Sequence, residues 1–327
     1  MTSVAEDPGD ASPHRPWYIR RMPSSAQRLT PATVLLLTTA PLLWAGNAVV
    51  GRIAAGWIPP VTFNLLRWVI AFLILLPLGG WVLRRGSPLW GAWRHYALLG
   101  LLAIAGYNTL QYLALHTSTP LNVTLVASSM PVWMLLVGRL GFQAPVTARA
   151  LFGAALSLAG VLVVLTQGQF GRLLQLQFVP GDGWMLLASF TWACYSWLLT
   201  RVRAPEIRRD WAAHLLAQIA LGLVWSAALT AGEWLWPAQA VAPHIEWSGA
   251  LAAVLAFVAI GPALIAYRCW GAGVERAGPT LASFFSNLTP LFAALMSAAL
   301  LGEPPRLYHG AAFALIVAGI VVSAKRG

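Results

Sequence analysis

The chain has 327 residues, of which 58% are hydrophobic and only 9% are charged. A soluble domain carries about 25% charged residues, so water is excluded as the solvent for most of this surface. The net charge of +11 would suit nucleic acid, but the basic residues stand in short polar gaps between apolar runs. Basic residues in such gaps are typical topology signals of a membrane protein. We therefore expect a lipid bilayer around the chain and no nucleic acid as a partner.

The first thirty residues are polar and rich in proline. A secretory signal would place a short apolar core behind a few residues and end at a small-residue cleavage site. Here an apolar run of full membrane-spanning length follows instead. We expect residues 1–30 to form a disordered cytoplasmic tail that is not cleaved.

Ten apolar segments follow the tail. Each has about the 20 residues that cross some 30 Å of hydrocarbon as a helix, and backbone groups that cannot stay unpaired in lipid make each segment helical. The expected spans are 33–51, 60–82, 96–115, 120–141, 147–166, 183–201, 211–232, 249–270, 279–301 and 307–324.

The basic residues predict the orientation of these spans. With a cytoplasmic N-terminus, seventeen basic residues fall in or near cytoplasmic segments, and Arg52, Arg172 and Arg306 fall on the opposite side. This asymmetry is the one that the positive-inside rule describes. It predicts an even number of spans and two cytoplasmic termini.

An internal repeat divides the chain. A shift of 159 residues aligns 120–165 with 279–324 without a gap and gives nine identities. Three of them are the proline pairs Pro120 and Pro279, Pro131 and Pro290, and Pro145 and Pro304. A shift of 148 residues pairs Trp44-Ala45 with Trp192-Ala193.

We therefore expect two five-helix repeats, 31–166 and 183–325, joined by a linker over 167–182. Because five is odd, the second repeat must cross the membrane in the opposite sense to the first. The predicted fold is an all-α membrane protein with ten transmembrane helices in two inverted five-helix repeats. Inverted repeats are an architecture of alternating-access transporters.

A polar stripe recurs in both halves. Thr124, Ser128 and Pro131 share one helix face, and the 159-residue shift carries them to Ser283, Asn287 and Pro290. The stripe indicates either a substrate cavity or hydroxyls that bond back to their own helix. Each proline removes a backbone donor, so we expect kinks or hinges at Pro131 and Pro290.

Mid-span aromatic and amide side chains extend this candidate cavity. Aromatic faces suit the apolar part of a small amphiphile, and amides suit its polar end; core packing is the alternative for each. The further candidates are Trp44, Asn47, Tyr107, Asn108, Gln111, Trp192, Tyr195, Tyr267 and Arg268. For Arg67 and Arg268, binding of a substrate carboxylate and a structural role both stay open; the position of Arg67, about two turns inside its span, favours the structural role.

The acidic residues fall in tails, loops or helix ends, so the sequence provides no intramembrane carboxylate for a proton relay or an organic cation. No spacing suggests a metal site or a cofactor, and the two cysteines form no disulfide framework. We expect uncoupled, gradient-driven transport. Gly310, Ala314 and Ala318 form a ridge of small residues that we expect to pack against another helix.

Several short stretches occur together along the chain. They are Trp44-Ala45-Gly46-Asn47, Phe63-Asn64-Leu65-Leu66-Arg67-Trp68, Gly106-Tyr107-Asn108, Tyr112-Leu113-Ala114-Leu115, Trp192-Ala193, Ser286-Asn287-Leu288-Thr289-Pro290 and Leu301-Gly302-Glu303. In these stretches the chain resembles the drug/metabolite transporter superfamily, in its ten-span EamA-type branch. The first half departs from the pattern, because Gln143-Ala144 stands where the second half has Gly302-Glu303.

The resemblance implies a multi-pass exporter of the bacterial inner membrane that moves amino acids, with aromatic amino-acid exporters as the nearest group. We expect broad specificity and a small-molecule substrate; the sequence leaves the oligomeric state open and is compatible with a monomer. Two alternatives remain at this point: an exporter of drugs or organic cations, and a membrane-embedded enzyme that modifies lipids. The sequence lacks the acidic counter-charge that an exporter of organic cations would need. It also lacks the catalytic acids or histidines that a lipid-modifying enzyme would need.

Overall fold

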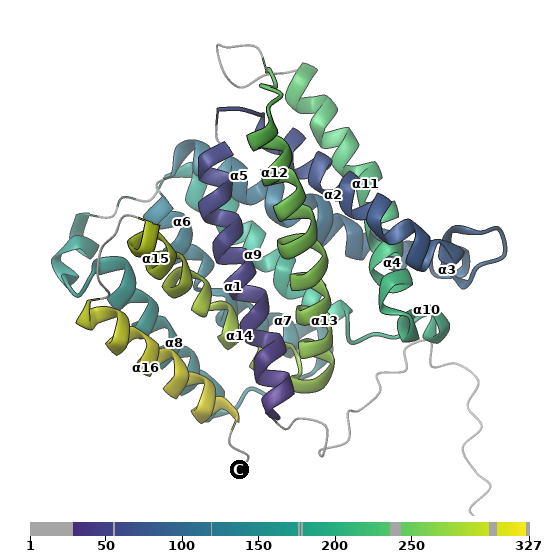
Figure 1. Ribbon diagram of the computed structural model, residues 1–327. Coiled ribbons are helices and arrows are strands. Elements are labelled where there is room, and N and C mark those ends of the chain that lie inside the picture. The colour runs from purple at the N-terminus through teal and green to yellow at the C-terminus, as the bar shows by residue number, and fades with distance from the viewer. Residues whose placement is uncertain are drawn as a thin grey trace, which may run out of the picture.

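A computed structural model describes residues 29–324, apart from 55, 119, 176, 178, 236–242 and 301–305. The expected tail lies almost entirely outside these residues. Within them the chain is all-helical and contains no β-strand. The helices stand roughly side by side, and the beginning of α1 lies at the same end of the molecule as the end of α16 (Figure 1).

The first half contains the following elements: α1 Pro31–Ala54, α2 Pro60–Gly79 with the 3-10 turn η2 Gly80–Leu83, α3 Pro88–Gly91, α4 Trp93–Leu99, the π-helix η3 Gly100–Tyr107, α5 Asn108–Thr117, α6 Pro120–Ala127, α7 Met130–Phe142 and α8 Ala148–Thr166. The 3-10 turn η4 Phe170–Gln175 follows. The second half contains α9 Pro180–Leu198, α10 Pro205–Arg209, α11 Trp211–Leu235, α12 Gly249–Val258, the π-helix η5 Ala259–Ile265, α13 Ala266–Ala277, α14 Pro279–Ser286, α15 Leu288–Leu300 and α16 Leu307–Ala324.

Seven helical segments in the described residues are long and apolar enough to cross a membrane: Pro31–Gly51, Pro60–Leu83, Val123–Phe142, Ala148–Thr166, Trp211–Leu235, Gly249–Ala277 and Leu307–Ala324. They coincide with seven of the predicted spans. Predicted spans 96–115, 183–201 and 279–301 are also helical, as α4–η3–α5, α9 and α14–α15. They are not among the seven segments above; α9 carries Asp182 in its first turn, and Asn287 separates α14 from α15.

Many of these helices begin at a proline. Proline is favoured in the first turn of a helix, where its missing N–H would have no intrahelical partner. The prolines in these first turns include Pro31, Pro60, Pro120, Pro180 and Pro279. Proline residues in the sequence thus mark the beginning of several of the helices.

Several corresponding elements of the two halves are separated by the same number of residues. The π-helices begin 159 residues apart, at Gly100 and Ala259, and α6 and α14 begin 159 residues apart, at Pro120 and Pro279. A π-turn inserts one residue into an α-helix and alters which side chains face its neighbours. The spacing found in the sequence therefore also relates irregular features of the backbone.

Helices α8 and α16 pack through glycines and lie side by side (Figure 1). A Cβ on Gly319 would come 2.6 Å from the carbonyl oxygen of Gly153, and one on Gly160 would come 2.8 Å from the carbonyl oxygen of Ala312. The predicted small-residue ridge is wrong in its position, because Gly310 and Ala314 are exposed. Helix α16 packs through the face that contains Gly319 instead.

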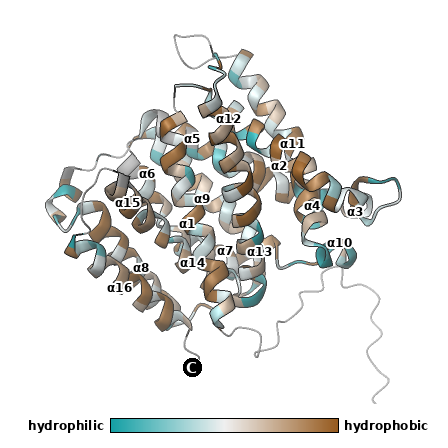
Figure 2. Ribbon diagram, viewed as in Figure 1, coloured by the Kyte–Doolittle hydropathy of each residue, from teal (hydrophilic) through white to brown (hydrophobic). Residues whose placement is uncertain are grey.

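The outer surface suits lipid. Large apolar side chains are exposed along the helices, as at Leu140, Leu151 and Phe313. Figure 2 shows hydrophobic residues along the helices and hydrophilic ones at the ends and in short segments such as α10. This distribution is the one expected of helices in a bilayer.

Candidate substrate cavity

A cavity of about 570 Å³ lies between helices of both halves. Its volume falls within the range of about 300–1,000 Å³ that is usual for small-molecule sites. The predicted residues that line it are Trp44, Asn47, Tyr107, Asn108, Gln111, Thr124, Ser128, Trp192, Tyr267, Asn287 and Pro290. The structure thus brings together most of the residues that the sequence singled out.

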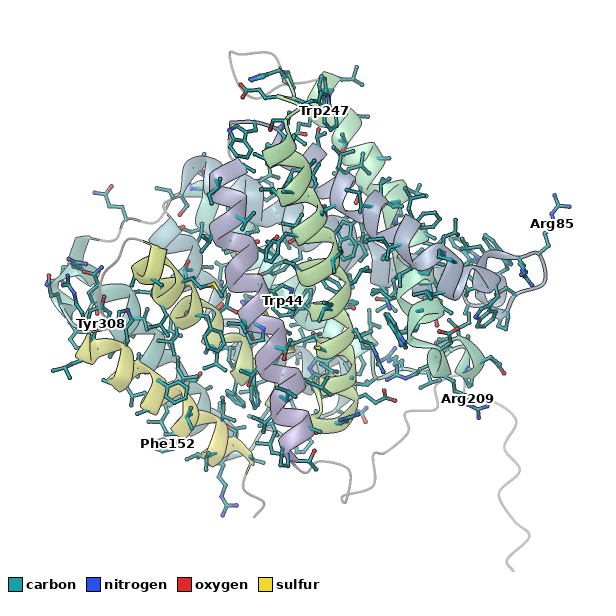
Figure 3. All side chains as sticks on the ribbon, in the orientation of Figure 1. Trp44, Arg85, Phe152, Arg209, Trp247 and Tyr308 are labelled. Atoms are coloured by element: carbon teal, nitrogen blue, oxygen red, sulfur yellow. The ribbon has the colours of Figure 1, made fainter. Side chains whose placement is uncertain are left out.

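Aromatic rings form one wall of this cavity. Trp192 of α9 is in contact with three other lining rings, with centroids 5.2 Å away at Trp44, 5.1 Å at Tyr107 and 5.5 Å at Tyr267. The Trp44 and Tyr267 rings meet Trp192 edge to face, a favoured aromatic geometry. Trp44 lies near the centre of the molecule (Figure 3). These rings offer apolar surface to a ligand.

Two hydrogen bonds attach this wall to the π-helices. Trp44 Nε1 donates to the carbonyl oxygen of Pro262 in η5 at 3.3 Å, and the Tyr267 hydroxyl donates to the carbonyl oxygen of Ala103 in η3 at 3.0 Å. Each bond joins a side chain of one half to the irregular backbone of the other. The aromatic wall is therefore held by both halves together.

Polar groups line the same cavity. Arg67 of α2 is 2% exposed, and its Nη1 donates to Asn47 Oδ1 at 3.3 Å. Asn108 and Gln111 of α5 line the same cavity. Arg67 is the charged residue in the described lining, which includes no Asp or Glu.

The two polar stripes lie at helix interruptions. Helix α6 ends at Ala127 and α7 begins at Met130, and Asn287 separates α14 from α15. Ser128 Oγ bonds back to the carbonyl oxygen of Leu125 at 2.6 Å. Asn287 Nδ2 donates to Ser157 Oγ of α8 at 2.9 Å. The hydroxyl thus follows the back-bonding alternative, whereas the amide connects two helices.

Four predicted residues lie outside the lining. The buried Tyr195 donates its hydroxyl proton to Gln218 Oε1 at 3.0 Å, and Ser283 Oγ donates to the carbonyl oxygen of Thr280 at 2.7 Å. Pro131 is buried away from the cavity, in the first turn of α7. Arg268 is exposed, with its guanidinium 5.6 Å from the Trp211 ring centroid. Since Tyr267 faces the cavity, the next residue along a helix must point about 100° away from it.

Some lining residues were not predicted as site residues. Arg67 and Phe63 lie four residues apart on α2, hence on one helix face, and Ser286 and Thr289 flank Asn287. Their spacing of four residues could have predicted that Phe63 and Arg67 line the cavity together. For Arg67 the sequence favoured a structural role over substrate binding, and the structure places it in the cavity lining.

Comparisons with known proteins agree with this picture. The model of the EamA-like transporter family matches residues 31–166 and again residues 179–324. An uncharacterized transporter of Archaeoglobus fulgidus is 24% identical over 90% of this chain and 98% of its own. The uncharacterized inner membrane transporter YedA of Escherichia coli is 26% identical over 86% and 87%.

The aromatic amino acid exporter YddG of Ancylobacter novellus is 26% identical over 89% of this chain and 96% of its own. A crystal structure of a protein that is 24% identical matches with a TM-score of 0.66, over 92% of this chain and 97% of that one; this likeness shows the fold alone. The relatives are transporters rather than enzymes, and the chain is a multi-pass inner membrane protein. It belongs to the EamA-like transporter family of the drug/metabolite transporter superfamily.

Proposed function

We propose that this transporter exports amino acids, aromatic and neutral ones in particular, through the cavity between its two halves. The observation that supports this proposal is that one cavity is lined both by the aromatic wall of Trp44, Trp192, Tyr107 and Tyr267 and by polar groups. An aromatic wall and a few polar groups suit a small amphiphile. A relative named as an aromatic amino acid exporter supports the same class of substrate.

We further propose ten membrane-spanning helices in two inverted halves that exchange access to the cavity between the two sides of the membrane. The double match of one family model and the 159-residue spacing of the π-helices support a duplication. The common end of the molecule at which α1 begins and α16 ends supports termini on the same side (Figure 1), and the basic residues favour the cytoplasm as that side.

Transport is proposed to be uncoupled from protons. The described lining residues include no Asp, Glu or His, the side chains that form proton relays in membranes. The same lining argues against organic cations as the main substrates, because it offers no negative charge to pair with them.

The test is efflux of labelled L-phenylalanine from proteoliposomes. The wild type should release it down its gradient, and Trp192→Ala and Asn287→Ala should slow release, because they remove part of the aromatic wall and the amide that connects α14 to α8. Trp247→Ala is the matched control, since Trp247 is 70% exposed and far from Trp44 (Figure 3). Absence of protein-dependent flux for any amino acid would contradict the function. Uphill accumulation driven by a pH gradient alone would contradict uncoupled transport.

A further inference from the structure

The cavity contains a buried cation that the fold does not fully satisfy. Arg67 is 2% exposed and lies about two turns inside α2. Its guanidinium donates to one neutral acceptor, Asn47 Oδ1, and its Nε has no hydrogen-bond partner among the described residues. A buried guanidinium without a paired anion is strongly unfavourable. An anionic partner at this position would remove that penalty.

A second unpartnered donor lines the same cavity. Asn108 is 5% exposed, and its Nδ2 has no hydrogen-bond partner in the described part of the chain. It comes from the junction of η3 and α5, whereas Arg67 comes from α2. Two helices therefore bring residues with unused N–H donors to the lining of one cavity, and these donor atoms are themselves buried. Donors of this kind suit an acceptor-only ligand group, and a carboxylate matches the fork of a guanidinium best.

Arg67 is connected to the aromatic wall through Trp68. The guanidinium lies 5.0 Å from the Trp68 ring centroid, and the Trp68 and Tyr267 centroids are 4.9 Å apart. Tyr267 in turn faces Trp192 in the cavity. A ligand with a carboxylate at one end and a ring at the other would contact both parts.

We propose that Arg67 and Asn108 form a carboxylate-binding site, and that the substrates are aromatic or apolar monocarboxylates with or without an amino group. This inference rests on the proposed function, since it assigns the substrate class of the same cavity. The described lining offers an ammonium group no carboxylate partner, so the amino group should add little to binding. The carboxylate is then the recognised group.

The experiment compares four ligands by titration calorimetry on the purified, full-length protein. They are L-phenylalanine, 3-phenylpropionate, which lacks the amino group, L-phenylalanine amide, which lacks the carboxylate, and acetate, which lacks the ring. The first two should bind with similar affinity, and the amide and acetate should each bind at least about tenfold more weakly. An amide that binds as tightly as the amino acid would overturn the proposal.

Three variants separate recognition from structure. Arg67→Gln should weaken both phenyl carboxylates by at least about tenfold and leave the amide unchanged, so the preference for carboxylate over amide should disappear. Asn108→Ala should reduce the same preference by several-fold, and it keeps the proposal testable if Arg67→Gln does not fold. Arg268→Gln makes the same change at an exposed arginine outside the cavity and should leave the preference as in the wild type.

The outcomes distinguish the two proposals. If wild-type protein binds and transports L-phenylalanine but Arg67→Gln and Asn108→Ala keep the full preference for carboxylate, the carboxylate site is overturned and amino-acid transport stands. If the wild type neither binds nor transports any of these ligands or any amino acid, both proposals are overturned.

Discussion

Single carboxylates at helix ends join segments that are far apart in the sequence. Glu233, near the end of α11, accepts hydrogen bonds from the backbone N–H groups of Val61 and Thr62, each at 2.8 Å, and from Thr62 Oγ1 at 2.7 Å. These two N–H groups belong to the first turn of α2, where they have no intrahelical partner. A carboxylate there also interacts favourably with the helix dipole.

We expect Glu233→Ala to destabilise the protein by about 1–3 kcal/mol, because it leaves these donors without their charged acceptor. Thermal unfolding in detergent measures the effect. Glu246→Ala is the control, since Glu246 is 60% exposed and paired only with an equally exposed His244, a type of pair that contributes about 0–1 kcal/mol. Equal losses for the two variants would contradict the capping role.

Asp210 accepts hydrogen bonds from backbone N–H groups at the start of α11, and we expect it to make the stability of the protein depend on pH. Burial raises the pKa of its carboxyl, but hydrogen bonds from Trp81 Nε1 and from the backbone N–H groups of Ala213 and Ala212 outweigh burial and lower that pKa below its usual value. A lowered folded-state pKa means that the contribution to stability is complete above the unfolded-state pKa of about 3.9 and is lost as the pH falls through the folded-state pKa.

Asp210→Ala should therefore be less stable than the wild type by about 0.5–2 kcal/mol at neutral pH. The difference should shrink as the pH falls below about 4. Unfolding curves for both proteins between neutral and acidic pH check this. A difference that grows on acidification would contradict the sign.

Residue roles could be predicted where they followed from a repeat. Trp44 and Trp192 were predicted as equivalent, and both line the cavity. The same 148-residue shift pairs Asn47 with Tyr195, yet Tyr195 turns to Gln218. A shift aligns backbones, whereas the direction of a side chain depends on the partner that each neighbouring helix provides.

At the scale of elements, close helix packing depends on the absence of a Cβ. Gly319 lies against the backbone of α8, with Gly153 O at 2.6 Å and Ser157 N at 3.0 Å from the position of an added Cβ. Because these atoms are backbone, the helices would have to separate. Gly310, on the same helix, has nothing within 4 Å.

We expect Gly319→Ala to destabilise the protein by about 1–3 kcal/mol through overpacking. Gly310→Ala should be neutral or stabilising by up to about 1 kcal/mol, because alanine is the better helix former and the site is open. Thermal unfolding of the two variants side by side checks this. A loss at Gly310→Ala as large as that at Gly319→Ala would show that packing against α8 is not the cause.

The sequence could predict helices but not their irregularities. Apolar runs predicted the helical segments, and seven of them have the length and hydropathy to span a membrane. The π-helices η3 and η5 left no signal, because one inserted residue does not change the hydropathy of a run. They matter to the cavity, since Ala103 and Pro262 within them accept the hydrogen bonds of Tyr267 and Trp44.

At the scale of the whole molecule, the cavity extends along the second half of α1 and beyond its end, but not along its first half. Its lining extends from Trp44 through Asn47 and Gly51 to Ile58 and Pro60, whereas Ala40, one turn before Trp44, is fully buried. The sequence predicted the two halves that enclose the cavity. It could not predict at which end the lining stops, because that depends on how the helices pack around the cavity.

Alternating access predicts how cysteines introduced at Gly51, in the cavity lining, and at Ala40, in the buried part of α1, react with thiol reagents. In a background where Cys194 and Cys269 are replaced by alanine, Gly51→Cys should react quickly with a membrane-impermeant thiol reagent added on the side of the 51–60 segment, because a side chain there meets open space. Ala40→Cys should react only from the opposite side and about 10- to 1,000-fold more slowly, because a minor conformation is populated at about 0.1–10%. Substrate that cycles the transporter should speed the second reaction, and the protein without added cysteines should show none. Fast labelling of Ala40→Cys from the same side as Gly51→Cys would mean a continuous channel and would rule out alternating access.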